Sequence, residues 1–368
     1  MATSLKKKPG GKRALLIGGG APNSSLIAGA LVAFLEKKVH FDVISTSGAG
    51  TLMGLLYKAP RNGDAKKSLQ AWAKAGVSDA IYRWFPIDYK VFQKPGLGAE
   101  LYRNMLLANP FTRPYVDMFA PNAQFGLWPD IVNFWLSTFS PMYLTPFSLG
   151  MCAHLPFINE AVDFAQVKKM KEQFYISSYN LDKEAMEIWD KGQITADHVK
   201  AAFAFPFIYP PYHMNGNDYI EGAAVDSLNF EALVSDDEKT PGIERDIESI
   251  VIFEILGNKK LIQKPDYLYD AWVNSIITPL VQNTKDDIKL FELVHNRDPV
   301  TGKPKRKLLK VPLMKDIPEQ HWKHVLDWSN SNVELLYKLG YEAGLEFCEK
   351  HKAELGLNLK PSPEMEEA

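Results

Sequence analysis

The stretch that decides the fold is Phe41-Asp42-Val43-Ile44-Ser45-Thr46-Ser47-Gly48-Ala49-Gly50. A short β-branched, apolar run ends there at Ser-Thr-Ser, and small residues lead into a helix-like stretch over residues 51–57. This order predicts a strand, a sharp turn and a helix, because only small neighbours let the chain bend so tightly. The turn would present the Ser47 hydroxyl near the first amides of a helix, where negative charge is stabilised. Ser47 is therefore a candidate acyl-transfer nucleophile, and an ordinary strand-to-helix turn is the alternative.

The segments around this stretch predict an α/β fold. Residues 14–17 form a short apolar run that stops at three glycines, and residues 26–38 have apolar side chains at helical spacing. A β-α-β-α order of this kind implies a mainly parallel sheet sandwiched by helices. Further buried strands are expected at residues 174–178 and 250–255, and an amphipathic helix near residues 332–354.

We expect one domain over residues 1–368. Its core would comprise about residues 13–60 and 168–260, followed by a helical C-terminal extension over about residues 261–368. Residues 61–167 are dense in aromatic residues and prolines and predict a helical cap inserted into the core. Within the cap, residues 131–159 carry no Asp, Glu, Lys or Arg. Prolines interrupt this stretch and resist a continuous helix, so it is interpreted as a lid over an apolar cavity rather than a membrane span.

Composition limits the classes of function. Hydrophobic residues make up 46% and charged residues 23% of the chain, as in a globular protein. The net charge of −2 predicts no attraction to nucleic acid. The two cysteines cannot form a disulfide framework, and no spacing of His, Cys or Asp suggests a metal site, so neither a metal nor a cofactor is expected. The N-terminus is basic without an apolar core, unlike a secretory signal, and we expect a cytoplasmic protein, with association with a membrane surface as an open alternative.

A second motif is the run Gly18-Gly19-Gly20 after the first strand. Glycine leaves backbone N–H groups unobstructed, so the run can bind a developing oxyanion. The run matches neither the P-loop pattern, because no Lys follows, nor Gly-x-Gly-x-x-Gly, because Asn23 stands at the sixth position. An oxyanion loop is favoured over nucleotide binding.

A third motif is Glu221-Gly222-Ala223. Small neighbours let this carboxylate approach another backbone closely. If Glu221 reaches Ser47, it could accept the hydroxyl proton as a general base, a task that burial assists by raising carboxylate basicity. The alternative is a solvated acid in a turn.

In the order in which they occur along the chain, the three motifs resemble those of the patatin-like phospholipase family. That family has a Gly-rich oxyanion loop, then a Gly-x-Ser-x-Gly elbow, and further downstream an Asp-Gly-Gly or Asp-Gly-Ala. The resemblance covers about residues 13–58 and 172–233. The matching stretches are Gly18-Gly19-Gly20-Ala21, Ser45-Thr46-Ser47-Gly48-Ala49 and Glu221-Gly222-Ala223, with Ala202-Phe203-Ala204-Phe205-Pro206 and Asp226-Ser227-Leu228 as flanks.

The resemblance implies a serine lipid acyl hydrolase, a phospholipase or esterase that works through a Ser–acid dyad and an acyl-enzyme. Ser47 would be the nucleophile and Glu221 the base. The oxyanion N–H groups would come from Gly18, Gly19, Gly20 and Gly48. The substrate would be a lipid or another fatty ester.

Departures from the family pattern motivate other functions. Glu221 replaces Asp, Pro22 replaces Arg, and Ser45 and Ala49 replace the elbow glycines. A catalytically degraded lipid-binding or scaffold protein on the same fold is one alternative, and an acyltransferase is another. A Ser-His-acid triad also stays open, with His213 nearest the acid in sequence. The basic run at residues 303–310 is read as a solvated loop, with transient contact with a membrane surface as the functional alternative.

Overall fold

The computed structural model describes residues 11–20, 23–84, 157–206, 209–233, 246–266, 268–323 and 325–357, with Leu155 and short pieces between residues 87 and 114. In this part of the chain the main sheet has eight strands in the order β10-β9-β1-β2-β5-β8-β7, and β6 also pairs with β5. The strands are β1 (Lys12–Ile17), β2 (Val43–Thr46), β5 (Gln173–Asn180), β6 (Ala185–Asp190), β7 (Tyr212–Met214), β8 (Asn217–Glu221), β9 (Ile247–Phe253) and β10 (Lys307–Lys310).

The strands from β10 to β5 are parallel, whereas β6 and β8 run antiparallel to β5. A separate short hairpin pairs β3 (Ile87–Asp88) with β4 (Phe92–Gln93). The longer helices are α1 (Ser24–Glu36), α2 (Ala49–Lys58), α3 (Ala65–Trp72), α11 (Leu268–Leu290) and α12 (Asn330–Lys350). The shorter ones are α4 (Asp79–Trp84), α8 (Ile158–Ala161), α9 (Phe164–Lys169) and α10 (Ala196–Ala202), with 3₁₀ turns at Gly222–Ala224, Lys259–Leu261 and Glu319–His321 and a π turn at Phe291–His295.

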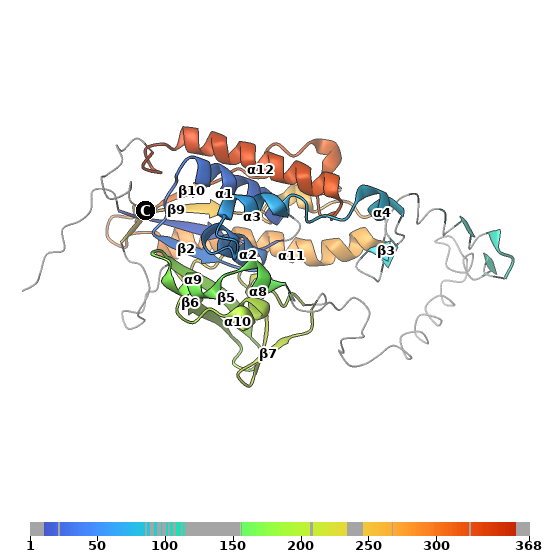
Figure 1. The fold of residues 1–368 in the computed structure, drawn as a ribbon, viewed down its shortest axis with the longest axis horizontal. Coiled ribbons are helices and arrows are strands. Elements are labelled where there is room, and N and C mark those ends of the chain that lie inside the picture. Colours follow the sequence, from blue (N-terminus) through green and yellow to red (C-terminus); the bar gives the residue numbers. More distant parts are fainter. Residues whose placement is uncertain are drawn as a thin grey trace, which may run out of the picture.

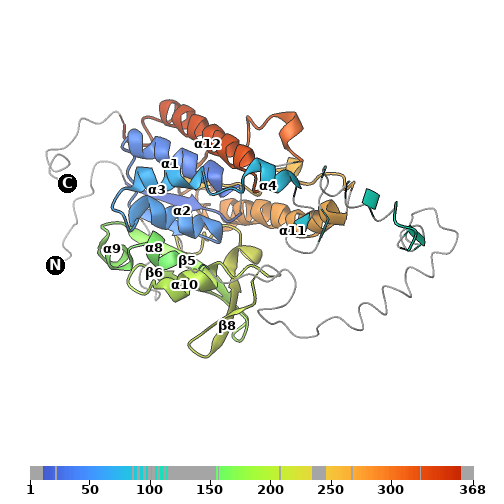
Figure 2. The ribbon, with the colours of Figure 1, turned by 45° about the vertical axis from the view of Figure 1, so that its right-hand side comes forward.

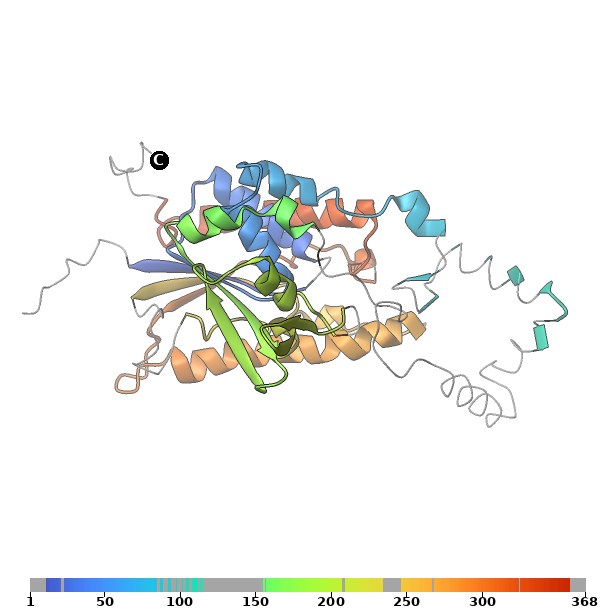
Figure 3. The same cartoon turned by 60° about the horizontal axis from the view of Figure 1, so that its bottom comes forward.

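Helices cover both faces of the sheet (Figures 1 and 3): α1, α2, α3 and α12 lie on one face, and α11 lies on the other. Strand β1 shows why both faces need a cover. Its side chains alternate, with Leu15 and Ile17 in one hydrophobic cluster and Ala14 and Leu16 in a second cluster, and all four are fully buried. A strand buried on both faces is typical of a parallel sheet between helix layers. The predicted mainly parallel α/β fold with a helical C-terminal region is confirmed.

Strand β10 is the main difference from the sequence prediction. Residues 307–310 lie in the basic run that we expected to be a loop, but they pair in parallel with β9. Leu309 is buried, whereas Lys307 and Lys310 are exposed. Lysines on an edge strand discourage pairing with another chain, so the charges that suggested a loop suit this position as well.

Most of the predicted aromatic cap at residues 61–167 lies outside the described residues, and the predicted domain boundaries stay predictions. Its described ends include α3, α4, α8 and α9. Figure 2 shows α8, α9 and α10 beside β5 and β6. Among the described residues, no helix combines the length and hydropathy that crossing a bilayer requires.

Candidate functional site

The candidate site lies where the parallel strands β1 and β2 end. Ile17 pairs with Thr46, so the glycine loop after β1 and the turn after β2 leave the sheet side by side. The N–H of Ser47 donates to the carbonyl of Ile17 at 3.0 Å and fixes this arrangement. Strand β8 ends at Glu221 beside the same edge, and the Glu221 N–H donates to the carbonyl of Ala204. The fold thus brings the three sequence motifs to one place.

The sharp turn itself is made by Gly48. This residue has φ +50° and ψ −131° between the end of β2 and the start of α2. An L-amino acid rarely adopts this conformation, and glycine adopts it without steric cost. Ser47 precedes the turn and is fully buried.

The hydroxyl of Ser47 donates to the main-chain carbonyl of Asp226 at 3.2 Å, and it forms no hydrogen bond with Glu221. The two preceding hydroxyls behave in the same way. Ser45 Oγ donates to the carbonyl of Asn229 at 2.7 Å, and Thr46 Oγ1 donates to the carbonyl of Tyr175 at 3.1 Å. All three hydroxyls at the end of β2 therefore tie the strand to neighbouring backbone.

The carboxyl group of Glu221 occupies the space beside Gly48. A Cβ atom added to Gly48 would lie 1.9 Å from Glu221 Oε1, and one added to Gly19 would lie 3.3 Å from the same oxygen. Glu221 is buried, and its carboxyl has no hydrogen-bond or ionic partner among the described residues. Burial raises its pKa to about 8. At neutral pH the group is therefore mainly protonated and can donate a hydrogen bond.

The glycine loop offers fewer donors than its sequence suggests. The N–H of Gly18 donates to the carbonyl of Phe253 at 3.0 Å and continues the sheet. Within the described residues, no backbone hydrogen bond occupies the N–H groups of Gly19, Gly20 or Gly48. Gly20 has φ +122°, a conformation that also favours glycine. Of the four predicted oxyanion residues, Gly18 uses its N–H group within the sheet, and the positions of Gly19 and Gly48 lie beside the Glu221 carboxyl.

A mainly apolar cavity of about 510 Å³ opens beside Glu221. Among the described residues that line it, Glu221 is the only one with a carboxyl group. The others are Gly20, Ala49, Leu52, Trp72, Ala75, Leu155, Phe157, Phe203, Phe205, Tyr209, Ala223, Leu256, Trp272, Val273, Ile276, Ile277, Leu280, Leu326 and Trp328. Ser47 does not line it. The volume and the lining are typical of sites for small apolar ligands.

A half-buried acidic pair, Asp226 and Asp287, supports the loop whose carbonyl accepts from the Ser47 hydroxyl. Burial, together with the neighbouring Asp287 carboxyl, raises the pKa of Asp226. Asp226 Oδ1 accepts from the N–H of Leu228, and Asp287 Oδ2 accepts from the N–H of Ser227. The role of Asp287 is not visible in the sequence, because nothing in its α-helical surroundings on α11 marks it as a partner of a loop far away in sequence.

Histidine takes no part in the described site. His213 Nδ1 lies 2.8 Å from Asp218 Oδ1 on the exposed β7–β8 hairpin. Neither Ser47 nor Glu221 has a histidine among its hydrogen-bond partners. Among the described residues, no group of His, Cys, Asp and Glu could hold a metal ion.

A comparison with known protein families agrees with this architecture. A family model described as patatin-like phospholipase matches residues 15–234, which is more than half of the chain and includes all three motifs. No curated protein matches the sequence. Among solved structures, VipD from Legionella pneumophila aligns with a TM-score of 0.39 and 13% sequence identity, over 94% of this chain and 68% of VipD. The chain therefore belongs to the patatin-like phospholipase family, a family of lipid acyl hydrolases.

Proposed function

We propose that this chain binds a single-chain acyl lipid, a fatty acid or its ester, in the apolar cavity without forming an acyl-enzyme. The observation that carries the proposal is that a glycine, Gly48, forms the sharp turn after β2. Gly48 holds the strained conformation from which an elbow residue projects its side chain, and it has no side chain to project. Glu221 Oε1 lies 1.9 Å from the position that the first side-chain atom would take, too close for both atoms to be present.

The sequence fits a family elbow in two registers. Ser45-Thr46-Ser47-Gly48-Ala49 puts a serine at the centre, and Thr46-Ser47-Gly48-Ala49-Gly50 puts a glycine there. The positive φ at Gly48 favours the second register. In this interpretation the nucleophile position carries no hydroxyl, and Ser47 is an anchor for the Asp226 loop.

The remaining groups suit recognition of an acyl head group. A protonated Glu221 would donate to a carbonyl or carboxylate oxygen, and the N–H groups of Gly19 and Gly20 would add two further donors. The acyl chain would lie against the aromatic and aliphatic lining, where each buried methylene contributes about 0.8 kcal/mol. Trp72 adds another donor to this wall, because its buried Nε1 has no hydrogen-bond partner in the described structure.

A binding assay with a naturally fluorescent polyunsaturated fatty acid tests the proposal. We expect saturable binding that unlabelled fatty acid displaces, and intact fatty acid or ester in organic extracts of the purified protein. Ile276→Asp places a charge in the cavity wall and should weaken binding at least about tenfold. Leu181→Asp, on an exposed turn, is the matched control and should bind as the native protein does. Equal binding by both variants would contradict the assignment of the cavity.

Hydrolysis through Ser47 and Glu221 is the second candidate, and the family assignment favours it. It requires the Ser47 hydroxyl to leave the Asp226 carbonyl and reach Glu221, which must be deprotonated to act as a base. An acyltransferase would need the same acyl-enzyme. Turnover of a panel of phospholipids and fatty esters that Ser47→Ala abolishes would establish this candidate in place of the first.

A further inference from the structure

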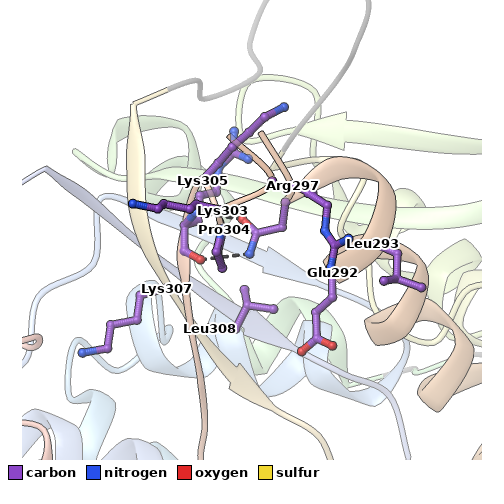
Figure 4. A pocket seen from close by; sticks show the side chains of 11 residues that line it. Glu292, Leu293, Arg297, Lys303, Pro304, Lys305, Lys307 and Leu308 are labelled. Atoms are coloured by element: carbon purple, nitrogen blue, oxygen red, sulfur yellow. Dashed lines mark hydrogen bonds between the residues drawn. The ribbon is translucent and has the colours of Figure 1, made fainter. Parts of the chain in front are cut away.

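A second cavity lies at the far end of α11 from the apolar one. Its volume is about 690 Å³, and Figure 4 shows residues that line it, among them Arg297, Lys303 and Lys305. Its lining residues are Glu292, Leu293, Asn296, Arg297, Gly302, Lys303, Pro304, Lys305, Arg306, Lys307 and Leu308. We call this set the basic groove.

The basic groove is remote from the apolar cavity. Ile276 on α11 lines the apolar cavity, and Glu292, just after the end of the same helix, lines the groove. At 1.5 Å per residue, these positions are about 24 Å apart. Figure 3 shows that α11 runs along one face of the sheet. The groove is therefore a separate feature and not an extension of the lipid site.

The groove concentrates positive charge in a chain whose net charge is −2. Five of its lining residues are Lys or Arg, and one is acidic. No salt bridge within the described residues engages Arg297 or Lys303, whereas Lys307 pairs with Glu354. Asp298 accepts from the N–H groups of Val300 and Thr301 and holds the tip of the loop. The charges of Arg297 and Lys303 are thus left to attract an external anion.

Exposed apolar side chains flank these cations. Leu290, Leu293 and Val294 are 57%, 50% and 55% exposed at the end of α11 and in the π turn, and Val300 at the loop tip is 91% exposed. Aliphatic side chains next to a cluster of Lys and Arg form the combination by which proteins bind at the surface of an anionic bilayer. A nucleic acid would use the cations but would have no use for the aliphatic side chains.

We propose that the basic groove, with the apolar side chains that flank it, docks the protein on an anionic membrane surface. Lys303 and Lys305 bind lipid head groups, and Val300 and Leu293 enter the interfacial layer. Leu280 lines the apolar cavity and is 12 residues from Glu292, so docking at this end leaves that cavity about 18 Å along α11 from the groove. The proposal goes beyond lipid binding in that cavity and does not depend on it.

Vesicle flotation tests the proposal with the full chain. We expect the protein to float with phosphatidylcholine vesicles that contain roughly 30% phosphatidylserine and not with pure phosphatidylcholine vesicles. Raising the salt from about 0.1 M to about 1 M should release it, because the screening length falls from about 10 Å to about 3 Å.

The variant Lys303→Gln/Lys305→Gln removes two cations. Each Lys or Arg near an anionic surface contributes about fivefold to binding, so the double variant should bind about 25-fold more weakly. The control Lys67→Gln/Lys74→Gln neutralises two exposed lysines on and just after α3 and should bind as the native protein does. Val300→Asp should also weaken binding, whereas Leu181→Asp should not. Fatty acid binding should be unchanged in all these variants.

Three outcomes would overturn the proposal. The first is equal flotation with neutral and anionic vesicles. The second is equal loss of binding in Lys303→Gln/Lys305→Gln and in Lys67→Gln/Lys74→Gln. The third is that the protein binds acidic peptides or nucleic acid through the groove and does not bind anionic vesicles.

Discussion

Substituting the turn residue tests the geometry around Glu221 most sharply. The change Gly48→Ser places a Cβ at φ +50°, 1.9 Å from Glu221 Oε1 and 3.0 Å from the Cβ of Ala223. The backbone conformation costs about 1–3 kcal/mol for a residue other than glycine. Overpacking against the buried carboxyl costs about another 1–3 kcal/mol. We therefore expect a loss of about 2–6 kcal/mol in the free energy of unfolding.

Gly63→Ser is the matched control. Gly63 also has a positive φ, at +72°, but a Cβ added there meets no atom within 4 Å. Only the backbone cost applies, so the expected loss is about 1–3 kcal/mol. Urea unfolding of both variants gives the comparison. A loss in Gly48→Ser no greater than in Gly63→Ser would refute the position assigned to the Glu221 carboxyl.

Shortening the side chain of Glu221 completes a double-mutant cycle with Gly48→Ser. Glu221→Asp withdraws the carboxyl by one methylene and should relieve the overlap in Gly48→Ser/Glu221→Asp. We expect the two changes to be coupled by about 1–3 kcal/mol in the favourable direction. The double variant also places a hydroxyl at the turn beside a carboxyl, and a fluorophosphonate probe should label it. A folded double variant that shows no coupling and no labelling would contradict Gly48 as the nucleophile position.

Three further predictions concern the same site. Ser47→Ala and Ser45→Ala each remove one hydroxyl that donates to a main-chain carbonyl, so each should lower the free energy of unfolding by about 1–3 kcal/mol in denaturant titrations and leave fatty acid binding intact. A selective loss of binding in Ser47→Ala would contradict the anchoring role. Burial raises the pKa of Glu221 from 4.5 to about 8, so between these pH values Glu221 ionises only in the unfolded state. The free energy of unfolding of the native protein should therefore fall by up to about 1.4 kcal/mol per pH unit as the pH rises across this window. Glu221→Gln should remove this slope. The affinity of the native protein for fatty acid should fall as the pH rises through about 8, because an ionised Glu221 no longer donates a hydrogen bond. The affinity of Glu221→Gln should stay level over the same range. Parallel pH profiles of the two proteins would show that the carboxyl does not contact the ligand.

The fold could be predicted from local patterns. The apolar run at residues 14–17 and the run at residues 41–44 have the length of buried strands, and the helices between and after them have the expected spacing. Both strands form, although β2 begins at Val43 and continues to Thr46. Strand β10 could not be predicted, because an edge strand with exposed lysines has the composition of a solvated loop.

The site could be predicted only in part. The three motifs meet as expected, because parallel neighbours end at one edge of the sheet. Which residue forms the turn could not be decided, because residues 45–50 are all small and fit the elbow in more than one register. The pairing of Ile17 with Thr46 and the hydrogen bond from Ser47 to Ile17 set that register, and both depend on tertiary contacts. The hydrogen bond of Gly18 with Phe253 is likewise invisible in the sequence.

Labelling of the native protein with a fluorophosphonate, read by intact mass and peptide mapping, tests the central claim most directly. Binding without an acyl-enzyme predicts that Ser47 carries no adduct, since its hydroxyl is buried and donates to the Asp226 carbonyl. A stoichiometric adduct on Ser47 that disappears in Ser47→Ala would contradict the claim and establish hydrolysis or acyl transfer through this serine.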